Sequence, residues 1–145
     1  MTAAGASRAA IWVMTATVLA QLFRHALFAD VPALVVVQIL AALLMIWARL
    51  TFGWRSFHGA ANPTEGGLVA RGPYRFVRHP IYSAILLFVW LGVASHPSWG
   101  NAALALITSA ATAVRIATEE QLVRARYPEY SAYAARTKCL IPFIL

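Results

Sequence analysis

One segment of this chain is apolar over enough consecutive residues to cross a lipid bilayer. Residues 34–48 read LVVVQILAALLMIWA, and Gln38 is their only strongly polar side chain. A spanning helix needs about 20 predominantly apolar residues, and the apolar character here extends over about residues 31–48. The sequence therefore predicts a transmembrane helix over 31–48.

Three other apolar stretches cover about residues 9–28, 80–95 and 102–117. The last two are somewhat short for spanning helices, so we expect each to extend into the membrane interface. They are joined by HPSWGN at 96–101, whose Pro and Gly indicate a tight turn within a helical hairpin. The first stretch follows Arg8 and could alternatively be a signal peptide, but no convincing cleavage site precedes a soluble domain.

The composition agrees with a membrane protein. The chain is 61% hydrophobic and only 12% charged, whereas soluble domains are about a quarter charged. So few charged side chains cannot cover a soluble surface of this size. We predict an all-α integral membrane helical bundle with about four transmembrane helices and a C-terminal cytoplasmic helical segment, forming one domain over 1–145.

The basic residues indicate the orientation of this bundle. Lys and Arg beside membrane spans lie preferentially in the cytoplasm. With four spans, the N-terminus, the loop 51–78 and the segment 119–145 share one side, which then holds all of the 12 basic residues except Arg24. We therefore expect both termini in the cytoplasm, and the Ala-rich composition suggests a bacterial inner membrane. This pattern accounts for the net charge of +7, so membrane lipids and not nucleic acid are the expected partners.

The two polar segments differ in character. The loop 51–78 contains repeated Gly and Pro, which predict tight turns. The segment 119–145 is charged and aromatic with helix-compatible spacing, and Pro128 divides it into two pieces. Its apolar end, CLIPFIL, is expected to pack back onto the membrane domain.

The first candidate site is the run Arg71-Gly-Pro-Tyr-Arg-Phe-Val-Arg-His-Pro-Ile-Tyr82, at the entrance to a predicted span. Pro80 suits the first turn of a helix, where free N–H groups favour an anionic group such as a carboxylate. Tyr74 and Tyr82 offer aromatic faces to a ring or a sulfonium, and His79 can donate or accept a hydrogen bond. The competing interpretation is a basic membrane flank with interfacial tyrosines.

The second candidate site begins with Glu119 and Glu120, at the end of the last apolar stretch. On a helix, Arg115 and Glu119 share one face, and Glu120 and Arg124 form another pair four residues apart. The competing interpretation is a salt-bridged helix end exposed to water. Acidic residues are scarce, however, at five in the chain, and carboxylates at the end of a span are candidates for binding a cationic ligand.

The sequence shows no metal site. None of the four histidines has close spacing to another His, to a carboxylate or to Cys139, and a single cysteine excludes an intrachain disulfide. The glycine-rich nucleotide motif, the phosphate loop and the nucleophile elbow are also absent.

The two clusters together resemble the isoprenylcysteine carboxyl methyltransferase family of membrane enzymes. The matching elements are Leu68-Val-Ala-Arg-Gly-Pro-Tyr-Arg-Phe-Val-Arg-His-Pro-Ile-Tyr82, Glu119-x-x-Leu122, Tyr130-x-x-Tyr133-x-x-Arg136-Thr137 and Leu140-Ile-Pro142. Their order and spacing fit over about residues 45–145. The resemblance implies a helical membrane fold and S-adenosylmethionine as cofactor, held in a cytoplasmic pocket. It also implies a lipophilic methyl acceptor that enters from the bilayer.

Specific residues inherit roles from this resemblance. Arg136 matches the arginine associated with acceptor binding and catalysis. Glu119 is preferred over Glu120 as the functional acid, because it keeps the spacing to the matching leucine and tyrosine. Cofactor contacts are expected at Leu68, Val69, Tyr74, His79, Pro80, Tyr82 and Glu119, with Tyr74 included for its aromatic face.

Several alternatives remain open at this level. The acceptor could be a lipophilic thiol, a phospholipid amine or an isoprenoid acid, because this short chain departs from the eukaryotic enzymes. An NADPH-dependent membrane reductase of the sterol-reductase type is similar in its C-terminal motifs, and a non-catalytic membrane scaffold is a third possibility. Association between chains could use the small residues Ala102, Ala105, Ser109 and Ala113.

Overall fold

The computed structural model describes residues 2–53 and 67–141 and is helical throughout its regular elements. Its elements are α1 (Ala3–Phe23), α2 (Pro32–Phe52), the 3₁₀ turn η2 (Gly72–Arg75), α3 (Pro80–Ser95), α4 (Trp99–Arg126) and α5 (Tyr130–Arg136). The predicted all-α bundle is therefore confirmed. The middle of the predicted loop 51–78 and the end of the CLIPFIL segment fall outside the described residues.

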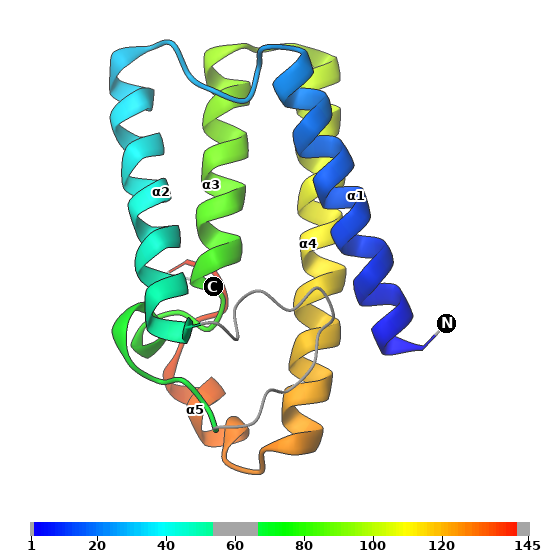
Figure 1. The fold of residues 1–145 in the computed structure, drawn as a ribbon, viewed down its shortest axis with the longest axis vertical. Helices are drawn as coiled ribbons and strands as arrows, with labels where there is room; N and C mark the ends of the chain where they lie inside the picture. Colours follow the sequence, from blue (N-terminus) through cyan, green and yellow to red (C-terminus); the bar gives the residue numbers. More distant parts are fainter. Residues whose placement is uncertain (1, 54–66, 142–145) are drawn as a thin grey trace.

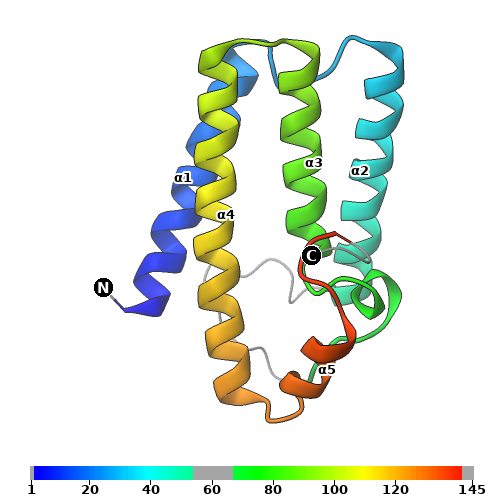
Figure 2. The same cartoon turned by 180° about the vertical axis from the view of Figure 1, so that it is seen from behind.

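The four long helices stand side by side in the order α2, α3, α4, α1 (Figure 1). Successive helices run in opposite directions, with α1 packed along α4 and α2 along α3. The α1–α2 and α3–α4 turns consequently lie at one end of the bundle. At the other end η2, α5 and the C-terminal segment gather beside the ends of α2 and α4 (Figure 2).

Three of the helices are long and apolar enough to cross a membrane, namely α1, α2 and α4. Helix α3 is apolar too, but it has only 16 residues. The outer face of α2 exposes large apolar side chains, among them Ile39, Leu43 and Ile46 at 54% each. Such a continuous apolar surface needs an apolar solvent, so the chain is a membrane protein.

Two helix boundaries differ from those expected. The first span, expected over 9–28, is a helix from Ala3 to Phe23, and His25 leaves the helical region with φ 53°. The last span, expected over 102–117, continues to Arg126. Residues 119–126 therefore extend α4 instead of starting a separate segment, because ion pairs four residues apart carry the helix beyond its apolar part.

Local sequence explains most helix ends. Side chains of Thr2 and Ser98 accept N-cap hydrogen bonds for α1 and α4, which satisfies backbone donors at the helix start. Helices α2 and α3 begin with Pro in the first turn, where the missing N–H costs nothing. Pro128 separates α4 from α5, as its position in the sequence indicated.

Close packing and buried polar contacts join the helices. A Cβ on Gly92 would lie 2.3 Å from the carbonyl oxygen of Ala26, so only glycine lets the α1–α2 turn approach α3. Gln38 donates from α2 to the carbonyls of Leu27 and Phe88 at 2.9 and 3.0 Å. In lipid such groups must find protein partners.

Part of the face expected to mediate association between chains is packed within one chain. Ala105 is fully buried, and Ala102 packs against the same core as Val89. Ser109 accepts a hydrogen bond from the Trp90 indole at 3.2 Å. Burial removes Ala105 from such a surface, whereas Ala113 is exposed, so association through this helix stays a prediction.

Candidate functional site

The C-terminal segment docks against the residues that precede α3. Val77 and Lys138 form a parallel bridge, and the amides of Arg78 and His79 donate to the carbonyls of Lys138 and Cys139 at 2.8 and 3.1 Å. The Ser83 hydroxyl on α3 adds a hydrogen bond to the carbonyl of Leu140. These bonds hold residues 138–140 over the start of α3, beside the lower part of α4.

Glu119 on α4 is held by groups from two helices. The Tyr82 hydroxyl donates to Glu119 Oε1 at 2.5 Å, and Arg115 Nη2 lies 3.0 Å from the same oxygen. The other oxygen, Oε2, lies 3.8 Å from His79 Nδ1, which is longer than a hydrogen bond. Glu119 Oε1 thus has two close donors, whereas the contact between Oε2 and His79 is longer.

Glu120 points to a different set of partners. Arg78 Nε lies 2.9 Å and His79 Nε2 lies 3.3 Å from Glu120 Oε1, and Arg124 Nη2 lies 3.2 Å from Oε2. The His79 imidazole therefore lies between two carboxylates, with Nδ1 toward Glu119 and Nε2 toward Glu120. We call His79, Tyr82, Glu119 and Glu120 the acidic cluster.

Helix α5 supports the acidic cluster from below. Arg78 Nη1 donates to the carbonyls of Ala134 and Thr137 at the end of α5. Burial lowers the pKa of Arg78, but its hydrogen bond and charge contact with Glu120 outweigh this effect, so the pKa is raised overall. The guanidinium is therefore a permanent positive charge that fixes the end of α5 to Glu120.

Two tyrosines complete this support. The Tyr133 hydroxyl donates to the carbonyl of Tyr74 at 2.7 Å. Burial raises the pKa of Tyr133 to about 12 and also raises the pKa of Tyr130. Both phenols are therefore neutral at physiological pH, and Tyr133 remains a hydrogen-bond donor.

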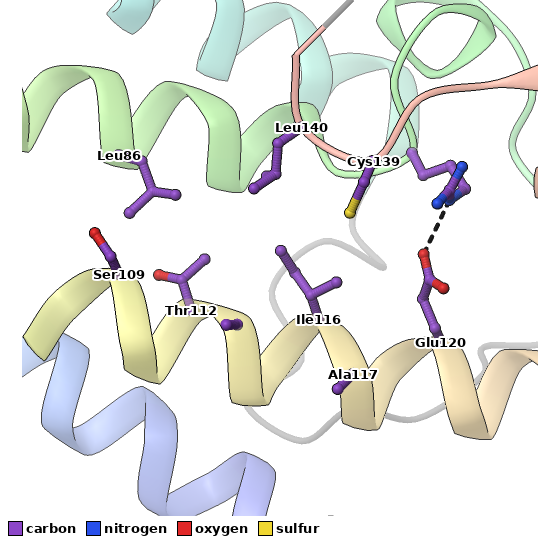
Figure 3. A pocket seen from close by; sticks show the side chains of 10 residues that line it. Leu86, Ser109, Thr112, Ile116, Ala117, Glu120, Cys139 and Leu140 are labelled. Carbon is purple, nitrogen blue, oxygen red and sulfur yellow. Dashed lines mark hydrogen bonds and ion pairs between the residues drawn. The ribbon is translucent and has the colours of Figure 1, made fainter. Parts of the chain in front are cut away.

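A cavity of about 370 Å³ lies between α3 and α4 (Figure 3). Its wall is mostly apolar on the α3 and α4 sides, and it ends at the Arg78–Glu120 ion pair. Ala113 and Ala117 are exposed, so this side of α4 leaves the cavity open toward the surroundings of the bundle. The lining residues are Arg78, Leu86, Ser109, Thr112, Ala113, Ile116, Ala117, Glu120, Cys139 and Leu140.

The structure brings together part of the site that the sequence predicted. His79, Tyr82 and Glu119 are in contact, and Pro80 occupies the first turn of α3 beside them. Glu120, the less favoured acid, is in the same cluster. The two sequence clusters therefore meet in space at the start of α3 and the charged part of α4.

Other predicted residues lie outside these contacts. The Tyr74 ring packs against Phe52, with 5.5 Å between ring centroids. Leu68 and Val69 are half-buried in the segment before η2, and none of their described contacts reaches the two carboxylates. Arg136 is exposed, and its Nε donates to the carbonyl of Ala132 in its own helix at 3.3 Å.

Sequence reasoning missed three members of the site. Arg78 belongs to the first candidate run but has no role assigned there, and Arg115 is expected only as a helix-face neighbour of Glu119. The signal for Arg115 was its place at the end of an apolar segment, where an ionisable residue usually has a function or a partner. Cys139 gave no signal, because its thiol reaches Glu120 and His79 only through the docking of the C-terminal segment.

Comparison with known proteins identifies the family. The family model for phospholipid methyltransferases matches residues 26–130, and this family includes proteins like the isoprenylcysteine carboxyl methyltransferases. The cobalt-zinc-cadmium resistance protein CzcN of Cupriavidus metallidurans is 31% identical, over 93% of this chain and 63% of its own length. The nickel-cobalt-cadmium resistance protein NccN of Alcaligenes xylosoxydans xylosoxydans is 30% identical, over 93% of this chain and 64% of its own length.

The chain therefore spans slightly less than two thirds of the curated relatives it matches. No solved structure matches it. The family match covers α2, α3 and all of α4, including Glu119 and Glu120, and so contains the acidic cluster. The chain belongs to the phospholipid methyltransferase family.

Proposed function

We propose that the protein transfers a methyl group from S-adenosylmethionine to a lipophilic acceptor at the lower end of the α3–α4 cavity. The observation that carries this proposal is the course of the cavity, which runs from an apolar wall within the bundle to a cluster of ionised side chains. An apolar cavity with a few converging polar groups is the usual form of a small-molecule site. An acceptor with an apolar chain would lie along α4, and its polar group would meet the acidic cluster.

The residues present fit the proposed cofactor. Its amino group and sulfonium are cationic, and two carboxylates of the acidic cluster can meet them: Glu120 lines the cavity, and Glu119 is its neighbour on α4. Its carboxylate is anionic, and Arg78, which bonds Glu120 and the end of α5, places a positive charge at the cavity end. The cavity volume of about 370 Å³ falls within the range of about 300–1,000 Å³ for ligand pockets.

Methyl transfer requires alignment of the acceptor with the methyl group more than it requires a strong base. When bound, S-adenosylmethionine supplies an already activated methyl group. The chain's own residues then have to hold the acceptor in line, which lowers the entropic cost of reaction, and to exclude water. Glu119 and Arg78 bind and orient, while Leu140 and Ile116 shield the cavity from water.

Arg136 keeps its proposed role as the residue that orients the acceptor. Its guanidinium is exposed on α5, at the end of the bundle where the acidic cluster lies. A guanidinium has five N–H donors. The Nε donor of Arg136 bonds the backbone carbonyl of Ala132. An acceptor carboxylate or phosphate at the membrane surface can therefore be bound in a bidentate way.

The same arrangement supports a proposed orientation in the membrane. We place the acidic cluster, both termini and α5 on the cytoplasmic side of a bacterial inner membrane. Support comes from the basic residues Arg71, Arg75, Arg78, Arg124 and Arg126 at that end, which match the preference of Lys and Arg for the cytoplasmic flank.

The relatives suggest a physiological setting. Their names refer to resistance to cobalt, zinc, cadmium and nickel. We infer that methylation by this protein contributes to tolerance of such ions. A strain lacking the gene should then grow less well than its parent in medium containing Zn²⁺, Co²⁺ or Cd²⁺, and equal growth of the two strains would contradict this setting.

Calorimetric titration of the detergent-purified protein with S-adenosylmethionine and with its demethylated product tests the function. The wild type should bind one equivalent, and Glu119→Gln should weaken binding at least tenfold. Asp30→Asn is the matched control, because Asp30 is an exposed carboxylate beside Ser95 at the opposite end of the bundle.

Each outcome is informative. Equal affinity of Glu119→Gln and wild type would remove Glu119 from the cofactor site. Absence of binding by a folded, monodisperse wild type would reject the methyltransferase proposal. The same sample would then be titrated with NADPH, since binding of that nucleotide indicates a reductase and binding of neither indicates a scaffold.

A further inference from the structure

His79, Glu120 and Cys139 bring three different metal-ligating groups together. One ligand atom of each lies within 4.8 Å of the ligand atoms of the other two. The residues come from the segment before α3, from α4 and from the C-terminal segment. The hydrogen bond from the His79 amide to the Cys139 carbonyl, 3.1 Å long, fixes two of the three backbones relative to each other.

We propose that His79, Glu120 and Cys139 bind one divalent transition-metal ion with affinity for sulfur, with Zn²⁺ as the representative ion. The three residues are called the His–Glu–Cys site. It does not depend on the methyl transfer proposed above. Imidazole nitrogen, carboxylate oxygen and thiolate sulfur are the ligands that Zn²⁺ uses in proteins, and the thiolate favours it over Mg²⁺ or Ca²⁺.

The surroundings of His79 favour a ligand role. Its Nε2 lies 3.3 Å from Glu120, and its Nδ1 lies 3.8 Å from Glu119 Oε2. Histidines that bind metals usually have a carboxylate or carbonyl behind the second nitrogen, which fixes the tautomer and the ring orientation. Glu119 is itself held by Arg115 and Tyr82, so a carboxylate is already fixed on the Nδ1 side of the ring, and a small shift would bring the two groups to hydrogen-bond distance.

The cavity supplies an open coordination position. Figure 3 shows the Cys139 sulfur and the Glu120 carboxylate facing the space between α3 and α4. Both residues line the cavity. A site with three protein ligands and one open position is the arrangement that leaves a metal accessible to water or to a small ligand.

Two guanidinium groups oppose metal binding, and the structure gives each an alternative position. Arg78 keeps the carbonyls of Ala134 and Thr137 as acceptors when it releases Glu120. The Arg124 side chain is 50% exposed and can turn into water. Loss of the Cys139 proton on binding offsets one of the two charges that the ion brings.

Titration of the detergent-purified protein with Co²⁺, followed by competition with Zn²⁺, tests the site. The wild type should bind one Co²⁺ and show a sulfur-to-metal charge-transfer band that Zn²⁺ abolishes. Cys139→Ser should lose this band. Glu119→Gln should keep the band and weaken binding by about 10- to 100-fold, the usual effect of removing the carboxylate behind a ligating histidine.

The Arg78→Gln variant should bind the metal ion more tightly, in contrast to the Glu119→Gln variant. It removes the guanidinium that competes for Glu120, so Zn²⁺ should bind several-fold more tightly. His96→Gln is the control, because His96 lies in the α3–α4 turn at the far end of the bundle. Binding of Co²⁺ without a charge-transfer band, or with a band that persists in Cys139→Ser, would overturn the proposal.

A measurement on the wild-type protein tests the site without relying on variants that could misfold. Cys139 is the only cysteine, so any thiol modification reports on it alone. One equivalent of Zn²⁺ should slow alkylation of Cys139 at least tenfold, and a chelator should restore the original rate. An unchanged alkylation rate at saturating Zn²⁺ would show that the thiol is not a ligand and would reject the site.

Discussion

Arg115 on α4 joins the first helix of the bundle to the acidic cluster through Ser7. Its Nη1 donates to the carbonyl oxygen and the hydroxyl of Ser7, at 3.3 and 3.1 Å, and its Nη2 pairs with Glu119. Ser7 is fully buried and Arg115 is 5% exposed. Helix α1 lies outside the residues that match the family, yet it thereby contributes to the position of Glu119.

Replacing Arg115 should therefore destabilise the whole bundle. Arg115→Gln leaves the Glu119 carboxylate and the Tyr82 hydroxyl without their strongest partner. Breaking a buried ion pair by removing one member costs about 3–5 kcal/mol, so the free energy of unfolding should fall by roughly this amount. Thermal or denaturant unfolding in detergent measures it.

Arg124→Gln is the matched control for this prediction. Arg124 pairs with Glu120 in the same i,i+4 geometry but is 50% exposed. Exposed ion pairs contribute about 0–1 kcal/mol, so the stability should change little. A similar loss of stability in both variants would show that burial of Arg115 is not the source of its effect.

The reactivity of the Cys139 thiol should increase at higher pH than that of a free cysteine. Burial raises the pKa of Cys139, Glu120 raises it further and Arg78 opposes the shift. The thiolate is the nucleophile, so alkylation in the absence of metal should be slow at neutral pH. The rate should still be increasing at pH values where a free cysteine, with a pKa of about 8.5, has levelled off.

Glu120→Gln tests the cause of that shift. The substitution removes the negative charge next to the thiol, and Arg78 then has Cys139 as its remaining charged neighbour when the thiol ionises. The midpoint of alkylation should move to lower pH than in the wild type. A midpoint that does not move would assign the shift to burial alone.

Part of this site could be predicted because the sequence marks it locally. Pro80 sets the start of α3, and HPSWGN sets its end, so the expected range 80–95 coincides with the helix. The charged end of α4 was harder to assign. Its apolar pattern stops near Ala117, but the pairs Arg115–Glu119 and Glu120–Arg124 continue the helix to Arg126.

Contacts between distant segments could not be obtained from periodicity. His79 and Glu120 meet only because α3 and α4 are antiparallel and the C-terminal segment docks beside them. Cys139 reaches them through the same docking, which no spacing in the sequence encodes. The resemblance to a family grouped Glu119 with His79 and Tyr82, and helix spacing paired Glu119 with Arg115, whereas the contacts of Arg115 with Ser7 and Tyr82 became visible only in three dimensions.

Arg136 offers a separate test of acceptor binding. Its side chain is exposed and its described hydrogen bond stays within α5, so Arg136→Ala should leave the stability within about 0.5 kcal/mol of the wild type. Because Arg136 is proposed to orient the acceptor, the Arg136→Ala variant should have a higher KM for the acceptor and an unchanged affinity for S-adenosylmethionine. Arg126→Ala is the control, because Arg126 is an exposed arginine at the end of α4. Equal effects of the two substitutions would show that Arg136 contributes only its positive charge at the surface.

A substitution in the cavity wall can distinguish the acceptor site from the cofactor site. Ala113 lines the apolar part of the cavity and is exposed, so Ala113→Leu adds bulk there without overfilling the core. We expect lower activity toward an acceptor with an apolar chain and unchanged binding of S-adenosylmethionine, since the acidic cluster lies farther along α4. Ala110→Leu is the control, because Ala110 is an exposed alanine of the same helix that does not line the cavity. Loss of cofactor binding in Ala113→Leu would place the cofactor in the apolar part and would require another path for the acceptor, whereas unchanged activity would show that the acceptor does not enter between α3 and α4.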